Sequence, residues 1–169
     1  MDPAQLRKAL AGDQDAFDQL YRDLSPRLSG FCRYLARDEA DARDLFQATW
    51  ARVLERREGY REDLSFEGWV LSLARNLWVD GGRRRRVERR ALELRARELR
   101  EMLAPPPDPL PLREALDVLS EEDREAFLLY RTQGLSLREV GRILGVTPWV
   151  VRERLARAQE TLERLLKIR

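Results

Sequence analysis

The sequence predicts an all-α protein made of two small helical domains. Almost every periodic segment repeats its apolar residues at helical spacing, and none shows the sustained alternation of a strand. Glycine and proline lie mostly at the ends of these segments. Five prolines within residues 105–111 forbid helix and strand there. We therefore expect a proline-rich linker between the two domains, or a segment that threads through a partner's channel.

The N-terminal half predicts four helices before an aromatic segment. The first begins near Pro3, and the second runs from Asp13 until Ser25-Pro26 breaks it. A third covers residues 26–36. The fourth begins in the acidic run 38–41, where negative charge complements a helix N-terminus, and buries Leu45, Thr49 and Val53 or a neighbouring set.

Residues 59–65 predict a loop, with Ser65 as the N-cap of an aromatic helix. Six apolar residues of this helix fall on one stripe: Phe66, Trp69, Val70, Leu73, Ala74 and Leu77. Leu71, Arg75 and Trp78 fall on the opposite side. Two interpretations remain open here, an outward surface that stacks bases and tracks phosphates, or a helix buried on both sides.

An arginine block follows the aromatic helix, with six arginines and one glutamate in residues 83–90. Lys8 and Lys167 are the only lysines, so almost all positive charge is guanidinium, which grips phosphate bidentately. A GC-rich genome would also favour arginine. Beyond the block, residues 87–103 predict a polar helix with a thin leucine face.

The C-terminal half begins with a short predicted helix over 112–119. Ser120 then caps a second helix over residues 124–133, which Gly134 ends. Residues 136–155 have the capping and turn residues typical of a helix-turn-helix, with further caps at Ser136 and Thr147. In its turn, Gly141 permits close helix approach, Gly145 takes the left-handed position, and Pro148 starts the last helix.

The last helix predicts a recognition surface opposite its apolar face, formed by Trp149, Arg152, Glu153, Ala156 and Arg157. Arginine can read guanine O6 and N7, and glutamate can accept a hydrogen bond from cytosine N4. Glu153 otherwise repels phosphates. The alternative is an ordinary helical hairpin.

Composition excludes several kinds of site. The 169 residues contain no histidine, and Cys32 is the only cysteine, which excludes an intrachain disulfide, a Cys/His zinc site and imidazole catalysis. We therefore expect no enzyme, no cofactor and no metal. No apolar run approaches a membrane span and the first residues lack a signal peptide, so we expect a cytoplasmic protein without membrane insertion.

The chain resembles the extracytoplasmic-function group of bacterial RNA polymerase sigma factors, of the sigma-70 family. In the C-terminal half the resemblance rests on Leu119, Arg124, Phe127, Gly134, Ser136, Glu139, Gly145, Val151, Arg152 and Leu155, among others. In the N-terminal half it rests on Asp13, Phe17, Tyr21, Asp41, Asp44, Gln47, Phe66, Trp69, Arg75, Asn76, Asp80 and the arginine block. Two patterns in the right order and spacing make the resemblance specific.

The resemblance implies different roles for two domains joined by a linker. It implies a domain over residues 1–92 that binds core polymerase and reads the −10 element, a linker over 93–111, and a domain over 112–169 that reads the −35 element. Its implied partners are core RNA polymerase, through the β′ clamp helices and the β flap, promoter DNA and an anti-sigma factor. The implied polymerase-binding residues are Asp41, Asp44, Leu45 and Gln47. The implied −10 residues are Tyr60, Arg61, Arg75, Asn76, Arg83, Arg84, Arg85 and Arg86, and the implied −35 residues are Trp149, Arg152, Glu153, Arg154 and Arg157.

Some residues depart from the family pattern. Ala48 stands where glutamate is usual, Gly81-Gly82 interrupts a helix, and Glu153 replaces a small hydroxyl residue. A stand-alone helix-turn-helix regulator is the main alternative, and a sigma-like protein without promoter activity is another. The Asp44 and Gln47 surface favours the sigma factor, because a simple regulator has no need of it.

Overall fold

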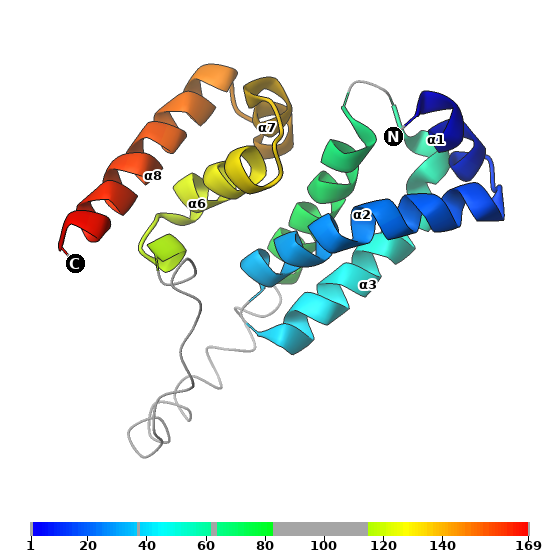
Figure 1. Ribbon diagram of the computed structural model, residues 1–169, viewed down its shortest axis with the longest axis horizontal. Coiled ribbons are helices and arrows are strands. Elements are labelled where there is room, and N and C mark those ends of the chain that lie inside the picture. Colours follow the sequence, from blue (N-terminus) through cyan, green and yellow to red (C-terminus); the bar gives the residue numbers. More distant parts are fainter. Residues whose placement is uncertain (1, 37, 62–63, 83–114, 169) are drawn as a thin grey trace, which may run out of the picture.

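The computed structural model describes residues 2–36, 38–61, 64–82 and 115–168. Within these ranges every regular element is helical, which confirms the all-α prediction. Figure 1 shows two helical groups beside each other, with their interface along the helix over 66–82. We call α1, α2, α3 and the 66–82 helix the N-terminal group, and α6, η2, α7 and α8 the C-terminal group. The arginine block, the predicted polar helix and the predicted linker fall within 83–114, outside the described residues.

Aspartate caps set the starts of the helices in the N-terminal group. These helices are α1 (Pro3–Leu10), α2 (Gln14–Leu35) and α3 (Glu39–Arg56), followed by a 3₁₀ turn, η1 (Arg57–Gly59). The Asp13 carboxylate accepts a hydrogen bond from the Ala16 amide at 2.9 Å, and Asp38 accepts one from the Asp41 amide at 2.8 Å. Leu45, Thr49 and Val53 are buried in α3, as predicted.

The predicted break at Pro26 is wrong, because α2 continues through it to Leu35. An interior proline removes one backbone hydrogen bond and costs about 3 kcal/mol. The apolar stripe keeps its phase across Pro26, and its buried members are Leu20, Leu24, Leu28, Phe31 and Leu35. Full burial of a single leucine is worth about 1.5–3 kcal/mol, so several together outweigh the proline.

The 66–82 helix is buried on both sides. The side chains of Phe66, Val70, Leu73 and Ala74 lie in the core of the N-terminal group, as the stripe predicts. Leu71 on the opposite side is fully buried as well, and Trp78 is half-buried. The second interpretation of this helix is therefore confirmed at Leu71, whereas Asn76 and Asp80 of the same helix are exposed.

Local capping also determines the C-terminal group. After a helical turn over 115–117 come α6 (Glu121–Phe127), the π-helix η2 (Leu128–Thr132), α7 (Leu137–Leu144) and α8 (Pro148–Ile168). The short helix predicted over 112–119 is thus helical only at 115–117 within the described residues. Ser120 caps α6, and Ser136 and Glu139 form a reciprocal capping box on α7. The buried apolar residues of both groups belong to one hydrophobic cluster.

Candidate nucleic-acid interface

The turn between α7 and α8 has helix-turn-helix geometry. Gly145 has φ 68° and ψ 31°, the left-handed conformation predicted for it. A Cβ on Gly141 would lie 2.7 Å from the Val146 carbonyl oxygen, so only glycine lets α7 approach this turn. The Thr147 hydroxyl accepts a hydrogen bond from the Val150 amide at 3.4 Å, and Pro148 begins α8. The start of α8 is therefore held on a rigid turn.

The first turns of α8 present the predicted recognition surface to solvent. Trp149 is 67% exposed, and Arg152, Glu153 and Ala156 are exposed beside it. Val151 and Ala158, on the opposite face, are fully buried against the rest of the C-terminal group. The exposed guanidinium and carboxylate stand one residue apart, so this surface carries both signs of charge and is not a plain cationic patch.

Arg154 and Arg157 are oriented by carboxylates of α6. Arg154 donates to Glu122 at 3.0 Å, while Arg157 binds Asp123 through both Nε and Nη2, at 3.2 and 2.7 Å. The hydrogen bonds that Arg157 donates to the Asp123 carboxylate raise the pKa of Arg157. The Arg154 side chain is only 14% exposed, but that of Arg157 is 54% exposed. Arg157 therefore keeps donors free for a second ligand, since guanidinium has five.

The 66–82 helix holds Asn76 and Arg75 in different environments. Asn76 is exposed, so its amide can donate to and accept from a base edge. Arg75 is 22% exposed and donates twice to one carboxylate oxygen of Glu125 in α6, at 3.0 Å from Nε and 2.9 Å from Nη2. The structure therefore joins a predicted nucleic-acid residue to the C-terminal group.

Tyr60 anchors the loop that precedes the 66–82 helix. Its ring packs edge-on against Phe66 and lies 5.3 Å from the ring of Trp69, and its hydroxyl donates to the Leu64 carbonyl at 2.8 Å. Arg61, the next residue, is exposed. Residues 62–63 and Arg83, Arg84, Arg85 and Arg86 lie outside the described residues.

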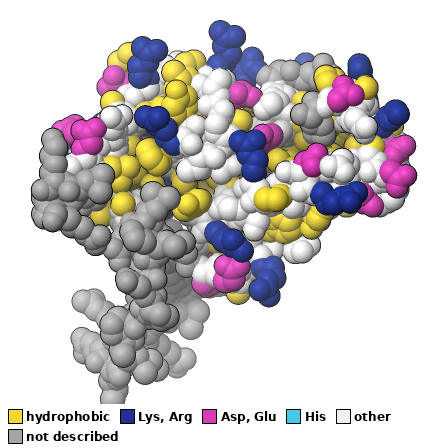
Figure 2. Space-filling view, in the orientation of Figure 1, with side chains coloured by type: hydrophobic (Ala, Val, Ile, Leu, Met, Phe, Trp, Pro, Cys, Tyr) yellow, Lys and Arg dark blue, Asp and Glu magenta, His cyan; other side chains and the backbone are white. Residues whose placement is uncertain are grey.

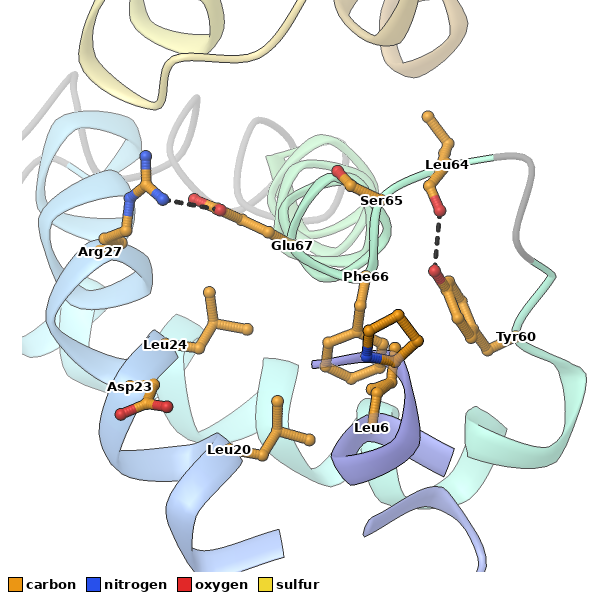
Figure 3. Close-up of a pocket in the computed structure, with 11 residues that line it drawn as sticks. Leu6, Leu20, Asp23, Leu24, Arg27, Tyr60, Leu64, Ser65, Phe66 and Glu67 are labelled. Carbon is orange, nitrogen blue, oxygen red and sulfur yellow. Dashed lines mark hydrogen bonds and ion pairs between the residues drawn. The ribbon is translucent and has the colours of Figure 1, made fainter. Parts of the chain in front are cut away.

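A cavity of about 510 Å³ opens beneath this loop, between α1, α2 and the start of the 66–82 helix. Figure 3 shows Leu20, Leu24 and Phe66 at its apolar side and the Arg27–Glu67 ion pair, 2.7 Å long, at its rim. Burial raises the pKa of the Glu67 carboxyl, although Arg27 opposes the shift. The cavity offers an apolar wall with one polar edge, which suits binding more than acid–base chemistry.

On α3, the predicted polymerase-binding residues differ in exposure. Asp44 and Gln47 are exposed, Asp41 is half-buried, and Leu45 is 6% exposed in the core. A neighbouring aromatic cluster escaped the sequence reasoning, in which Tyr21 of α2 packs against Phe46 and Trp50 of α3 at 6.2 and 4.7 Å between ring centroids. Phe17 also contacts Trp50. Aromatic residues spaced four apart on both helices are the signal that could have revealed it.

The described residues offer few side chains for metal binding or thiol chemistry. In the described part of the chain, no group of three carboxylates or thiols is placed to hold a metal ion. Burial raises the pKa of Cys32 to about 12, so its thiol stays protonated and unreactive near neutral pH. None of the helices in the described ranges is long and apolar enough to cross a bilayer.

Figure 2 shows arginine and lysine side chains scattered among acidic ones over the visible face, without a continuous cationic patch. Hydrophobic side chains gather between α6 and α8, where Phe127, Tyr130, Leu155 and Leu162 line an apolar groove of about 260 Å³. The visible face therefore combines mixed charge with a small apolar groove on the C-terminal group.

Two family models match the chain in succession. The model of sigma-70 region 2 matches residues 20–88, and that of sigma-70 region 4 matches residues 110–162. The chain is 33% identical over 165 residues to the RNA polymerase sigma factor CarQ of Myxococcus xanthus, covering 92% of this chain and 91% of CarQ. It is 34% identical to the ECF RNA polymerase sigma factor SigE of Mycolicibacterium smegmatis, covering 89% of this chain and 63% of SigE. The structure of CnrH in complex with the cytosolic domain of CnrY matches with a TM-score of 0.73 and 27% identity, over 98% of this chain and 96% of that chain.

Proposed function

The chain belongs to the extracytoplasmic-function group of the sigma-70 family of RNA polymerase sigma factors, and we propose that its two helical groups divide promoter recognition between them. A sigma factor lends promoter specificity to core RNA polymerase, so the chain acts in transcription initiation. It works in the cytoplasm beside the polymerase and performs no catalysis of its own. Residues 1–92 form the polymerase-binding and −10 domain, 93–111 the linker, and 112–169 the −35 domain.

The α8 surface is the −35 reader in this proposal. The observation that carries the proposal is a preformed helix-turn-helix whose first α8 turns are exposed while the opposite face is buried. A helix so mounted fits a major groove. Trp149, Arg152 and Glu153 face the bases, and Arg154 and Arg157 support them from the side of α6, with Arg157 free to add a contact.

The −10 element is read by the loop around Tyr60 and Arg61 and by the helix that carries Arg75 and Asn76. The exposed Asn76 amide is the base reader, and the arginines from Arg83 to Arg86 hold the backbone phosphates. On α3, the exposed residues Asp44 and Gln47 contact the β′ clamp helices. Asp41 and Leu45, which are more buried, hold this surface in place. The C-terminal group meets the β flap.

An anti-sigma protein is the proposed regulatory partner. CnrH, a structural relative, is held in its solved structure by the cytosolic domain of CnrY, which supports a similar arrangement for this chain. The apolar groove between α6 and α8 supports a protein contact on the C-terminal group.

The test is complex formation and transcription in vitro with purified core polymerase on genomic DNA fragments. We expect the chain to join the core enzyme and to direct initiation at specific sites. Replacing Asp44 and Gln47 together with alanine should weaken the complex, whereas Glu55→Ala, an exposed control on the same helix, should not. A chain that binds duplex DNA but never joins core polymerase would instead be a stand-alone regulator.

Two further variants separate the reading surfaces. Asn76→Ala should impair open-complex formation and leave core binding intact, with the exposed Asp80→Ala as control on the same helix. Arg152→Ala should cost about 1–3 kcal/mol of −35 binding if the arginine reads a base. Arg164→Ala removes an equal charge farther along α8 and should have little effect on sequence preference. Unchanged promoter binding in Arg152→Ala would contradict this assignment.

A further inference from the structure

We propose that the free chain is held closed by a latch between its two helical groups, and that this latch withholds Arg75 from nucleic acid until the groups separate. The latch consists of two polar contacts, Arg75 with Glu125 and Arg27 with the Gln133 carbonyl, and of close packing where Gly68 lies beside Glu139 and Leu135. The inference rests on the proposed function only for the assignment of Arg75 to the −10 surface.

The Arg75–Glu125 pair is the central contact. Both Nε and Nη2 of Arg75 donate to Glu125 Oε2, and the two side chains are only 22% and 10% exposed. A phosphate on Arg75 would have to displace this carboxylate. Because a buried carboxylate without its cation is costly, Glu125 and a phosphate cannot both occupy the site at little cost. Phosphate binding therefore favours separation of the groups.

A second contact joins α2 to the end of η2. Arg27 donates to the Gln133 carbonyl at 2.7 Å and to Glu67 at 2.7 Å, so one guanidinium binds both groups. Figure 3 shows the Arg27 side chain pointing up toward the yellow ribbon of the C-terminal group. Gln133 is 5% exposed, so its carbonyl has little access to water in place of Arg27.

Close packing forms the third part of the latch. Glu139, in the capping box of α7, lies beside the start of the 66–82 helix, where Ser65 caps the Gly68 amide. A Cβ on Gly68 would lie 3.0 Å from Ser65 Oγ and 3.8 Å from both Glu139 Oε1 and Leu135 Cδ2, so a larger side chain would have no room there. Leu135 is 5% exposed, so an apolar contact seals this side of the interface. The small residue at Gly68 therefore lies directly against the C-terminal group.

The remaining carboxylates of α6 reinforce the effect on nucleic acid. Glu122 and Asp123 pair with Arg154 and Arg157 of α8, so one short helix holds arginines from both proposed promoter-reading surfaces. Glu121, in the same turn, is exposed. In the closed chain, arginines of both proposed surfaces are therefore already bound to carboxylates of α6.

The decisive variant is Glu125→Ala, compared with Glu121→Ala. Both remove one negative charge from α6, but only Glu125 reaches across to the N-terminal group. Small-angle X-ray scattering should show a larger radius of gyration for Glu125→Ala alone. Fluorescence anisotropy with a mixed-sequence single-stranded DNA should show affinity rising about tenfold, the scale expected for releasing one part-buried charge pair. Glu121→Ala should change either quantity little.

Two further variants keep the test valid if Glu125→Ala folds poorly. The exchange Arg75→Glu with Glu125→Arg restores a pair of opposite sign and should restore the compact radius. Gly68→Leu inserts a side chain between the caps without changing charge, and should open the chain and raise single-strand affinity with Arg75 intact. Circular dichroism confirms that each variant remains helical.

An unchanged radius in both Glu125→Ala and Gly68→Leu would overturn the latch. Opening without a gain in single-strand affinity would overturn the masking of Arg75. Neither measurement contains core polymerase, so these failures are distinct from a failure to join the core enzyme, which would refute the proposed function.

Discussion

Gly141 shows how a single missing side chain fixes the helix-turn-helix. A Cβ added at Gly141 would lie only 2.7 Å from the Val146 carbonyl oxygen, so the backbone of the turn would have to shift to accept it. Gly30, inside α2, has no atom within 4 Å of the corresponding point. The same substitution should therefore have opposite effects at these two helical glycines.

We expect Gly141→Ala to lower the free energy of unfolding by about 1–3 kcal/mol, because the turn must move. Gly30→Ala should raise it by about 0.5–1 kcal/mol, because alanine loses less backbone entropy. Urea denaturation followed by circular dichroism measures both. Equal effects of the two substitutions would show that close approach at Gly141 is not limiting.

Glu139 is the residue whose ionisation should matter most to the closed chain. Burial opposes its ionisation, but hydrogen bonds from Ser65 and Ser136 outweigh burial and lower its pKa. A lowered folded pKa gives stability that is present above the unfolded value of about 4.3 and is lost as pH falls through the folded value. The Ser65–Glu139 contact should therefore weaken in acid.

We expect Glu139→Gln to lower the melting temperature at pH 7 by about 2–4 °C, the effect of roughly 1 kcal/mol in a chain of this size. The difference from the unmodified chain should shrink as the pH falls below about 4. Thermal melts across pH 3–7 give this comparison. A difference that stays constant over that range would mean that the Glu139 charge is irrelevant to folding.

At the scale of elements, α2 shows that a helix can be held together by what it packs against. Pro26 lies exposed in its interior, and the core stripe passes it without a change of phase. Pro3, by contrast, occupies the first position of α1, where proline is well tolerated.

Pro26→Ala should therefore stabilise the chain by up to about 3 kcal/mol and increase its helical signal, because it restores a backbone hydrogen bond. Pro3→Ala should change stability by about 0.5 kcal/mol or less. Calorimetry and far-ultraviolet circular dichroism test the pair. A loss of stability in Pro26→Ala would indicate that the core depends on a proline-induced bend.

At the scale of the whole molecule, the two helical groups share one hydrophobic cluster and are joined by Arg27. Removing this side chain leaves the Gln133 carbonyl and the Glu67 carboxylate without their partner. Arg22, earlier on α2, is exposed and donates a hydrogen bond to the Asp18 carbonyl of its own helix.

We expect Arg27→Ala to destabilise the chain by about 1–2 kcal/mol and to speed amide exchange near Gln133, because the interface loosens. Arg22→Ala should cost roughly 0.5 kcal/mol or less. Hydrogen-exchange mass spectrometry locates the change. Equal protection near Gln133 in both variants would show that Arg27 does not couple the groups.

Much of the fold follows from local sequence. Ser120 and Ser136 cap the predicted helices, and Gly134 and Gly145 take positive φ values at the predicted ends. These features depend on residues within about four positions of one another, so they can be inferred without the rest of the chain. The exposed start of α8 follows in the same way, because the apolar face of the helix determines its opposite face.

Tertiary structure decided what lies against these elements. Neither the burial of Leu71 nor the continuation of α2 through Pro26 could be read from neighbouring residues. Arg75 and Glu125 are 50 positions apart, and no periodicity relates them. Local propensities and caps by themselves determined two helical units and a helix-turn-helix. Only packing between the units decided that Arg75 faces a carboxylate in the closed chain, because that contact depends on surfaces brought together by the shared core.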